Sequence, residues 1–159
     1  YNVPGRTGCG LQPKTVARLA DHPNIVAIKE ATGDISQVAE MCRVVPEDFA
    51  VYSGNDDMVV PLMSLGGKGV ISVTANVIPA DITAMTHYAL EGDYANAARI
   101  QLATKPLTDA LFADVNPIPV KAALAMMGKM EMTYRLPLCA PSEAVQARLR
   151  TEMEAYGLL

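Results

Sequence analysis

The chain has 159 residues, of which 50% are hydrophobic and 19% charged, a composition typical of a globular domain with a real core. Its formal net charge of −4 and its lack of a basic cluster argue against a nucleic-acid-binding or membrane-surface protein. No apolar run approaches the roughly 20 residues that a helix needs to cross a bilayer. We therefore expect a cytoplasmic protein.

Strand-like and helix-like runs alternate along the first part of the chain. The apolar pattern predicts strands at residues 1–3, 25–29, 49–53 and 70–73. Helices are expected between them and after the last one, at residues 13–20, between Asp34 and Pro46, between Asp57 and Gly66, and at residues 79–90. A strand–helix order repeated in this way is typical of parallel βαβ units.

The remainder of the chain is expected to be entirely helical. One helix follows Asp93 and should kink or break at Pro106, a second follows Asn116, and the last opens near Ser142 and ends at Gly157. We therefore divide the chain into residues 1–92, half of a barrel, and residues 93–159, a C-terminal helical region.

Two architectures fit the alternating part: an open doubly wound sheet, or part of a (β/α)8 barrel. The glycines at residues 5–10 match neither the dinucleotide-binding fingerprint nor the phosphate-binding loop. Polar residues instead gather just after each predicted strand, at residues 6–7, 29–32, 53–57 and 72–76. A barrel builds its active site from the C-terminal ends of several strands, so this distribution favours the barrel.

The most informative residue is Lys29, at the end of an apolar run that reads as a strand buried on both faces. Burial disfavours an ammonium, so we expect this amine to lose its proton easily and to act as a nucleophile toward a carbonyl. The preceding letters, VAI, also precede the ATP-binding lysine of protein kinases, but no other kinase motif is present. The simpler alternative is a solvated lysine at a strand end.

Cysteine and histidine usage indicates neither disulfides nor a metal centre. Cys9, Cys42 and Cys139 are scattered and form no C-x-x-C pair, and His22 and His87 lie far apart in sequence. We expect reduced thiols and no zinc site.

Several segments, taken in chain order, resemble the dihydrodipicolinate synthase family. Residues 1–8 (YNVPGRTG) are similar to the family's tyrosine-containing motif, and residues 29–33 (KEATG) to its Schiff-base lysine motif. Further similar segments are residues 53–56 (SGND), 69–76 (GVISVTAN), 116–121 (NPIPVK) and 135–138 (RLPL). Each segment is short, and their common order along the whole chain makes the resemblance specific.

The resemblance implies that this chain is the second half of a (β/α)8 TIM barrel, strands 5–8, followed by a C-terminal helical region. The N-terminal half of the barrel, which carries the family's paired-threonine loop, would come from a cut or separate chain. The resemblance also implies a homotetramer, pyruvate and aspartate 4-semialdehyde as substrates, and no metal or organic cofactor. The isolated chain is then expected to be inactive.

The resemblance assigns a role to five residues. Lys29 would form the imine with pyruvate, and Tyr1 would be the proton shuttle; the alternative for Tyr1 is a packing tyrosine. Arg6 would hold the carboxylate of the aldehyde substrate by paired hydrogen bonds, against the alternative of a solvated loop arginine. Gly54 and Ile71 would act through backbone carbonyls near the lysine, against simple core packing for Ile71.

Two other functions stay open. One is a pyruvate-dependent class I aldolase of the same superfamily with another aldehyde partner. Arg6 argues against it, because relatives such as N-acetylneuraminate lyase resemble the family in fold and lysine but lack an arginine at this place. The other is an inactive fragment that only associates. Asn55, Asp56, Thr74 and Asn76 are weaker candidates for the surroundings of the site.

Overall fold

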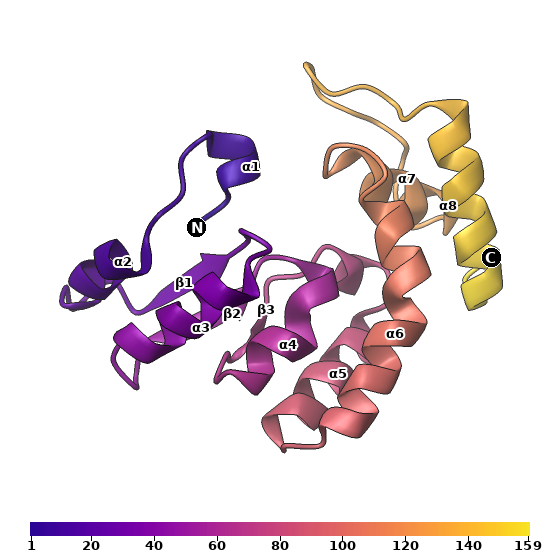
Figure 1. Cartoon of the computed structure of the whole chain (residues 1–159). Coiled ribbons are helices and arrows are strands. Elements are labelled where there is room, and N and C mark those ends of the chain that lie inside the picture. Colours follow the sequence, from indigo (N-terminus) through magenta and orange to yellow (C-terminus); the bar gives the residue numbers. More distant parts are fainter. The chain divides into compact units, whose positions relative to one another are not determined.

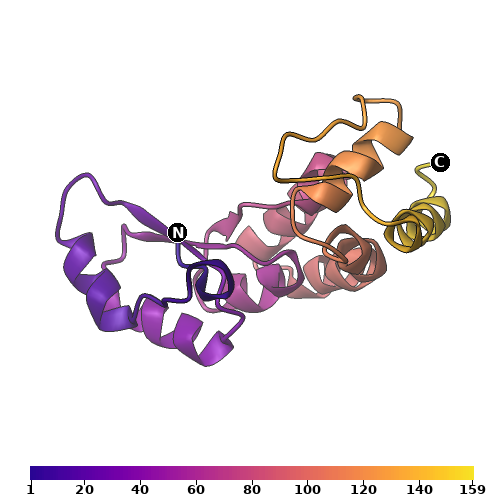
Figure 2. The ribbon, with the colours of Figure 1, turned by 90° about the horizontal axis from the view of Figure 1, so that it is seen from above.

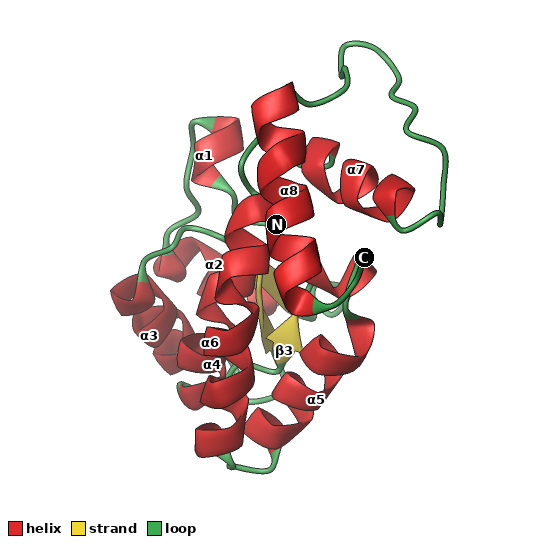
Figure 3. Cartoon of the chain, turned by 90° about the vertical axis from the view of Figure 1, so that its right-hand side faces the viewer, coloured by secondary structure: helices red, strands yellow, loops and turns green.

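The computed structural model describes all residues, 1–159 (Figure 1). In chain order the elements are α1 (Pro4–Thr7), α2 (Pro13–Ala20), β1 (Ala27–Glu30), α3 (Ile35–Val44), β2 (Ala50–Ser53), η1 (Asp56–Met58), α4 (Val59–Ser64), β3 (Gly69–Val70), η2 (Thr74–Asn76), α5 (Pro79–Leu90), α6 (Tyr94–Leu111), α7 (Ile118–Met126) and α8 (Glu143–Tyr156). Helices and loops make up most of the chain, and the strands are short (Figure 3).

The three strands form one parallel sheet in the order β1-β2-β3. Ala27 pairs with Ala50 and Lys29 with Tyr52, so neighbouring strands end side by side. This result confirms the predicted strands at β1 and β2 and the parallel arrangement, whereas β3 is shorter than predicted and shares only Val70 with the expected residues 70–73. The predicted strand at residues 1–3 is wrong, because only Asn2 pairs, through a single parallel bridge to Glu30, and the chain turns into α1 at Pro4. Proline fits the first position of a helix, where its missing N–H costs nothing.

The chain divides into two compact units, residues 1–72 with 84–98 and residues 73–83 with 99–159. The first unit has an apolar core that joins one face of the sheet to the helices packed on it. Its buried members are Val16, Ile28, Val38, Met41, Phe49, Val51 and Leu62. They come from α2, β1, α3, β2, α4 and the segment before β2, so the core of the first unit lies on one face of the sheet.

Helix α3 begins where the sequence predicts. The Asp34 carboxylate accepts hydrogen bonds from the backbone N–H groups of Ser36 (2.9 Å) and Gln37 (3.1 Å), which are otherwise unpaired in the first turn. This confirms the predicted N-cap, and the helix ends at Val44, just before Pro46. Cys42 on this helix is half-buried, and burial raises the pKa of its thiol, whereas Cys9 and Cys139 are exposed.

In the second unit, α7 packs against α8. The Ser142 hydroxyl caps α8 by accepting a hydrogen bond from the Val145 N–H (3.3 Å), and Gly157 ends the helix with a left-handed φ of 80°. Leu149 and Met153 are fully buried and form the packed side of the helix. Both predicted ends of this helix are therefore confirmed.

Helix α6 contradicts the expectation of a break at Pro106, because it continues from Tyr94 to Leu111 with the proline inside it. The turn after the proline carries Leu107, Ala110 and Leu111, all of which are buried. Burial of these side chains stabilises the helix beyond the proline and outweighs the lost backbone hydrogen bond. No helix of the chain combines the length and the apolar character needed to cross a bilayer.

The Tyr156–Asp81 contact predicts a loss of stability at alkaline pH. Burial, and then the hydrogen bond that the phenol donates to the Asp81 carboxylate, raises the pKa of Tyr156 to about 12. A phenol whose pKa is near 10 when unfolded contributes this stability fully below pH 10 and loses it as the pH rises from about 10 to about 12. Tyr156→Phe should therefore show a flatter decline of the urea midpoint above pH 10 than the unmodified chain. Parallel declines would contradict this assignment.

Candidate active site

Lys29 lies near the C-terminal end of β1 on the open face of the sheet. Ile28 and Glu30 point to the covered face and are 5% and 2% exposed, whereas Ala27 is exposed and Lys29 is half-buried. Alternation along the strand therefore holds, but the expectation of burial on both faces is wrong for this chain. The apolar core of the first unit lies on the opposite face of the sheet from Lys29.

The Tyr1 ring covers the Lys29 amine. The Lys29 Nζ atom lies 4.2 Å from the ring centroid, close enough for an attractive contact between an ammonium and the ring face. Tyr1 is 62% exposed as a residue, although its ring lies over the amine. The first residues lie beside β1 in two perpendicular views (Figures 1 and 2). Residues that are far apart in the sequence are thus adjacent at the predicted site.

Gly54 follows β2 and leaves room for the lysine. A Cβ atom at this position would lie 2.6 Å from the Ala31 Cβ, 3.1 Å from the Glu30 carbonyl oxygen and 3.2 Å from the Lys29 Cε. Gly54 also donates a 2.7 Å backbone hydrogen bond to that Glu30 oxygen. Only glycine permits this approach without displacing backbone, which explains its place in the sequence motif.

Ile71 and Arg6 complete the set of predicted residues. The Ile71 N–H donates to the Ser53 carbonyl (2.9 Å), which places its backbone beside the end of β2, and its side chain is 50% exposed. Simple core packing of Ile71, the alternative considered from the sequence, is therefore not what this chain shows. Arg6 lies on the single turn α1 and is exposed. A direct contact joins Tyr1 and Lys29, and Gly54 lies beside the lysine side chain. The Ile71 backbone is connected to them through its hydrogen bond to the end of β2.

Sequence reasoning missed two buried polar residues directly behind the site. Asn2 is 1% exposed and donates its side-chain amide to the Glu30 carboxylate (Nδ2 to Oε2, 2.8 Å). The signal was present, because each of these polar residues directly follows a predicted site residue in the chain. Their places in the motifs do not show that the two side chains pair with each other.

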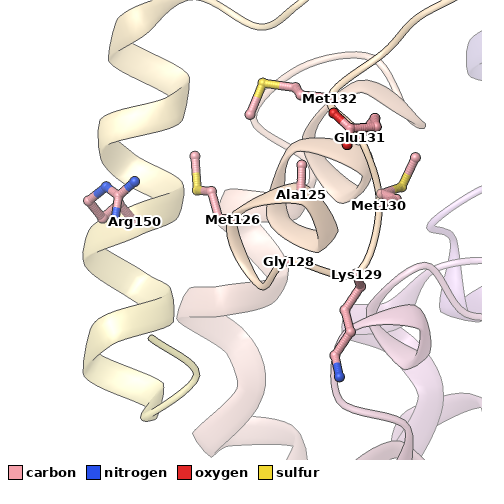
Figure 4. Close-up of a pocket in the computed structure, with 8 residues that line it drawn as sticks. All are labelled: Ala125, Met126, Gly128, Lys129, Met130, Glu131, Met132 and Arg150. Atoms are coloured by element: carbon pink, nitrogen blue, oxygen red, sulfur yellow. The ribbon is translucent and has the colours of Figure 1, made fainter.

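Asp56, a weaker candidate, is also buried, and its carboxylate accepts a hydrogen bond from the Ser72 hydroxyl. No cluster of three or more His, Cys, Asp or Glu side chains is placed to hold a metal ion. One open cavity of about 670 Å³ lies in the second unit and contains none of the predicted site residues (Figure 4). Its lining residues are Ala125, Met126, Gly128, Lys129, Met130, Glu131, Met132 and Arg150.

Comparison with known proteins identifies the family. The family described as "Dihydrodipicolinate synthetase family" matches residues 1–156. The chain belongs to this family. The resemblance inferred from the motifs is therefore confirmed, and the elements described above belong to the α/β-barrel fold of dihydrodipicolinate synthases.

Individual relatives agree over the whole chain. The chain is 48% identical over 159 residues to the 4-hydroxy-tetrahydrodipicolinate synthase of Thermodesulfovibrio yellowstonii, covering 100% of this chain and 55% of that protein. A solved structure described as the first monomeric dihydrodipicolinate synthase variant has a TM-score of 0.97 at 44% identity and covers 100% of this chain and 54% of its own. A dihydrodipicolinate synthase from Acinetobacter baumannii, described as complexed with pyruvate, has a TM-score of 0.97 at 41% identity, with 100% and 55% covered. The chain thus spans about half the length of the relatives it matches.

Proposed function

We propose that this chain supplies the lysine-bearing half of a 4-hydroxy-tetrahydrodipicolinate synthase, a lyase that condenses pyruvate with aspartate 4-semialdehyde. The observation that carries the proposal is the contact between the Lys29 amine and the Tyr1 ring at the end of a parallel strand, with Gly54 leaving space beside the lysine. Membership of the family and the relative described as complexed with pyruvate support the choice of substrate.

The proposed reaction begins at the Lys29 Nζ atom. The neutral amine adds to the ketone carbon of pyruvate, and loss of water gives a protonated imine. The imine withdraws electrons, so the methyl group loses a proton and an enamine forms. The enamine carbon then bonds to the aldehyde carbon of aspartate 4-semialdehyde. Attack of that substrate's own amine on the imine carbon closes the ring and releases Lys29. The imine performs the work of an electron sink, so the reaction needs no organic cofactor.

The other predicted residues have places in this scheme. The Tyr1 phenol, beside the amine, passes protons to and from the reacting atoms. The Arg6 guanidinium holds the carboxylate of the aldehyde substrate, and the backbone carbonyls of Gly54 and Ile71 face the bound pyruvate near the lysine. The second candidate function, a pyruvate-dependent aldolase with another aldehyde, uses the same lysine chemistry and differs in what Arg6 binds.

We further propose that the chain corresponds to the second half of the barrel, strands 5–8, and works with the N-terminal half in a tetramer in the cytoplasm. The order of elements supports this placement: no strand follows β3, and the remaining long elements α5–α8 are all helical. The uncovered front of the sheet is where the other strands of a closed barrel would complete the site. One relative is described as a monomeric variant and is an exception to the tetramer within the family.

Borohydride trapping tests the lysine chemistry. The chain is co-expressed with each half of the Thermodesulfovibrio yellowstonii synthase in turn, incubated with pyruvate and reduced. We expect a stable pyruvate adduct, located on Lys29 by peptide mapping, with the N-terminal half as partner, and little turnover by the chain alone. Lys29→Arg, which keeps the charge, should abolish the adduct.

The same preparations separate the alternatives. An adduct with turnover of sugar-acid aldehydes and none of aspartate 4-semialdehyde would favour the second candidate function. Absence of any adduct in a folded assembly would remove the enzymatic proposal. Activity restored only by the C-terminal half would show that the placement in the barrel is wrong.

A further inference from the structure

A buried hydrogen-bonded pair lies behind the Tyr1–Lys29 contact, on the covered face of the sheet. The side chains of Asn2 and Glu30 are 1% and 2% exposed, and their partners are all supplied by the chain. The Asn2 amide donates to the Glu30 Oε2 (2.8 Å) and to the Leu11 carbonyl (3.3 Å), while its Oδ1 accepts from the Leu11 N–H (2.9 Å). The Glu30 Oε1 accepts from the Thr32 N–H (2.7 Å).

The backbone of Asn2 is held at the same place. Its N–H donates to the Lys29 carbonyl (2.9 Å), and its carbonyl accepts from the Ala31 N–H (2.9 Å). These two bonds are the whole pairing between the N-terminal segment and β1, which is a single isolated bridge. One bridge fixes little chain by itself, so the side-chain bonds of Asn2 are needed to hold the segment in this register.

The geometry links this pair to the site in front. Successive residues of an extended segment point to opposite faces, so Asn2 behind the sheet puts Tyr1 in front of it. The same alternation in β1 puts Glu30 behind and Lys29 in front. Asn2 and Glu30 are thus buried and hydrogen-bonded behind the sheet. Tyr1 and Lys29, the residues that precede them in the chain, make the 4.2 Å contact between amine and ring in front of it.

Because the pair is buried, it favours one register of the N-terminal segment over a shifted one. A carboxylate or amide removed from water is costly unless its hydrogen-bonding groups are satisfied, so the arrangement in which all partners are present is strongly preferred over a shifted one. Glu30 has no cation as partner; its two oxygens accept N–H groups of Asn2 and Thr32. Exchange of the carboxylate for an amide would place one N–H donor opposite another.

We propose that Asn2 and Glu30 are positioning residues that hold the Tyr1 ring over the Lys29 amine. Their effect on the reaction rests on the proposed function, but their effect on the ring position does not. Asn2 and Glu30 contact no substrate. They determine the position of the Tyr1 ring relative to the Lys29 amine.

The first experiment uses the unmodified full chain in solution by NMR. We expect nuclear Overhauser contacts between the Tyr1 ring protons and the Lys29 ε-methylene, an upfield ring-current shift of that methylene, and slow exchange of the Asn2 side-chain amide. Absence of the contacts, or exchange of that amide as fast as the exposed Asn24 amide, would overturn the proposal without any variant having to fold.

The second experiment is a double-mutant cycle. Asn2→Asp places two carboxylates together, and Glu30→Gln leaves one of the two N–H donors without an acceptor. In the double variant the glutamine amide donates to the aspartate while its oxygen still accepts from Thr32, so the bond is restored with its direction reversed. Asn24→Asp and Glu47→Gln, at exposed positions of the same unit, are the matched controls.

We expect each single variant to lose the ring-current shift and to slow borohydride trapping by about 10-fold or more, since small misplacements of reacting groups are costly. The double variant should recover the shift and most of the rate, and the controls should change neither. An unchanged ring-current shift in folded single variants would overturn the proposal. A folded double variant that recovered neither the shift nor the trapping rate beyond the level of the single variants would also overturn it. If no protein, including the unmodified chain, formed the borohydride adduct while the ring-current shifts changed as expected, that result would instead count against the proposed function.

Discussion

Tyr1→Phe is expected to lower turnover by about 100-fold to 10,000-fold in the assembly with the N-terminal half, the range typical for loss of a proton-transfer group. Phenylalanine keeps the ring that lies 4.2 Å from the Lys29 amine, so the contact and the fold should persist. Only the phenolic O–H disappears. The measurement is the steady-state rate with pyruvate and aspartate 4-semialdehyde, with folding checked by circular dichroism.

Tyr52→Phe is the matched control for this prediction. Tyr52 pairs with Lys29 in the sheet and is half-buried on the same face, but nothing assigns it a part in the reaction. Its replacement keeps the ring and removes only a hydroxyl that the proposed reaction does not use, so the rate should stay within about 2-fold. Full turnover by Tyr1→Phe would show that the phenol only packs over the lysine and carries no proton.

Gly54→Ala is expected to damage both the fold and the site. The new methyl group would lie 2.6 Å from the Ala31 Cβ and 3.1 Å from the Glu30 carbonyl oxygen, so backbone must move. Overpacking of this kind costs about 1–3 kcal/mol in the free energy of unfolding. The Lys29 Cε, 3.2 Å away, must move as well, so the pyruvate adduct should form at least about 10-fold more slowly.

Gly5→Ala separates this effect from the general effect of adding a methyl group. An added Cβ at Gly5 meets nothing within 4 Å, and the residue lies in the short helix α1. Alanine is the better helix former, so stability should be equal or slightly higher. Urea unfolding of both variants, with the rate of adduct formation, makes the comparison. Equal stability and equal rates for the two variants would show that the space at Gly54 is not needed.

The sequence was most reliable where short-range chemistry decides structure. The carboxylate of Asp34 caps α3 because it accepts two N–H groups of that helix's first turn, and Gly157 ends α8 because it adopts a positive φ. The strands at β1, β2 and β3 follow from apolar runs that can be identified without knowing their partners.

The errors lie where packing outside the local segment decides. Residues 1–3 look like a strand, but pairing needs a neighbour over several residues and only Asn2 has one. Pro106 looks like a helix break, but the buried side chains after it hold α6 together. The expected division at residues 92 and 93 stays a prediction about domains.

The part of the site that depends on short motifs was predictable from the sequence. Lys29 and Tyr1 stand in motifs whose chemistry can be inferred from the side chains alone, and the structure places them in contact. Lys29 is only half-buried, because the apolar core of the first unit packs on the opposite face of the sheet. The sequence shows that Asn2 and Glu30 each follow a predicted site residue, but it does not show that the two side chains lie opposite each other, so their pairing was not predicted.

The bridge at Asn2, together with the side-chain bonds of that residue, decides which face of the sheet Tyr1 occupies. A slip of that segment by one residue would exchange its two sides, burying an aromatic ring behind the sheet and turning an amide toward the lysine. The identity of the group that meets the amine therefore depends on the register of one short segment, and a shift of a single residue replaces a phenol with an amide.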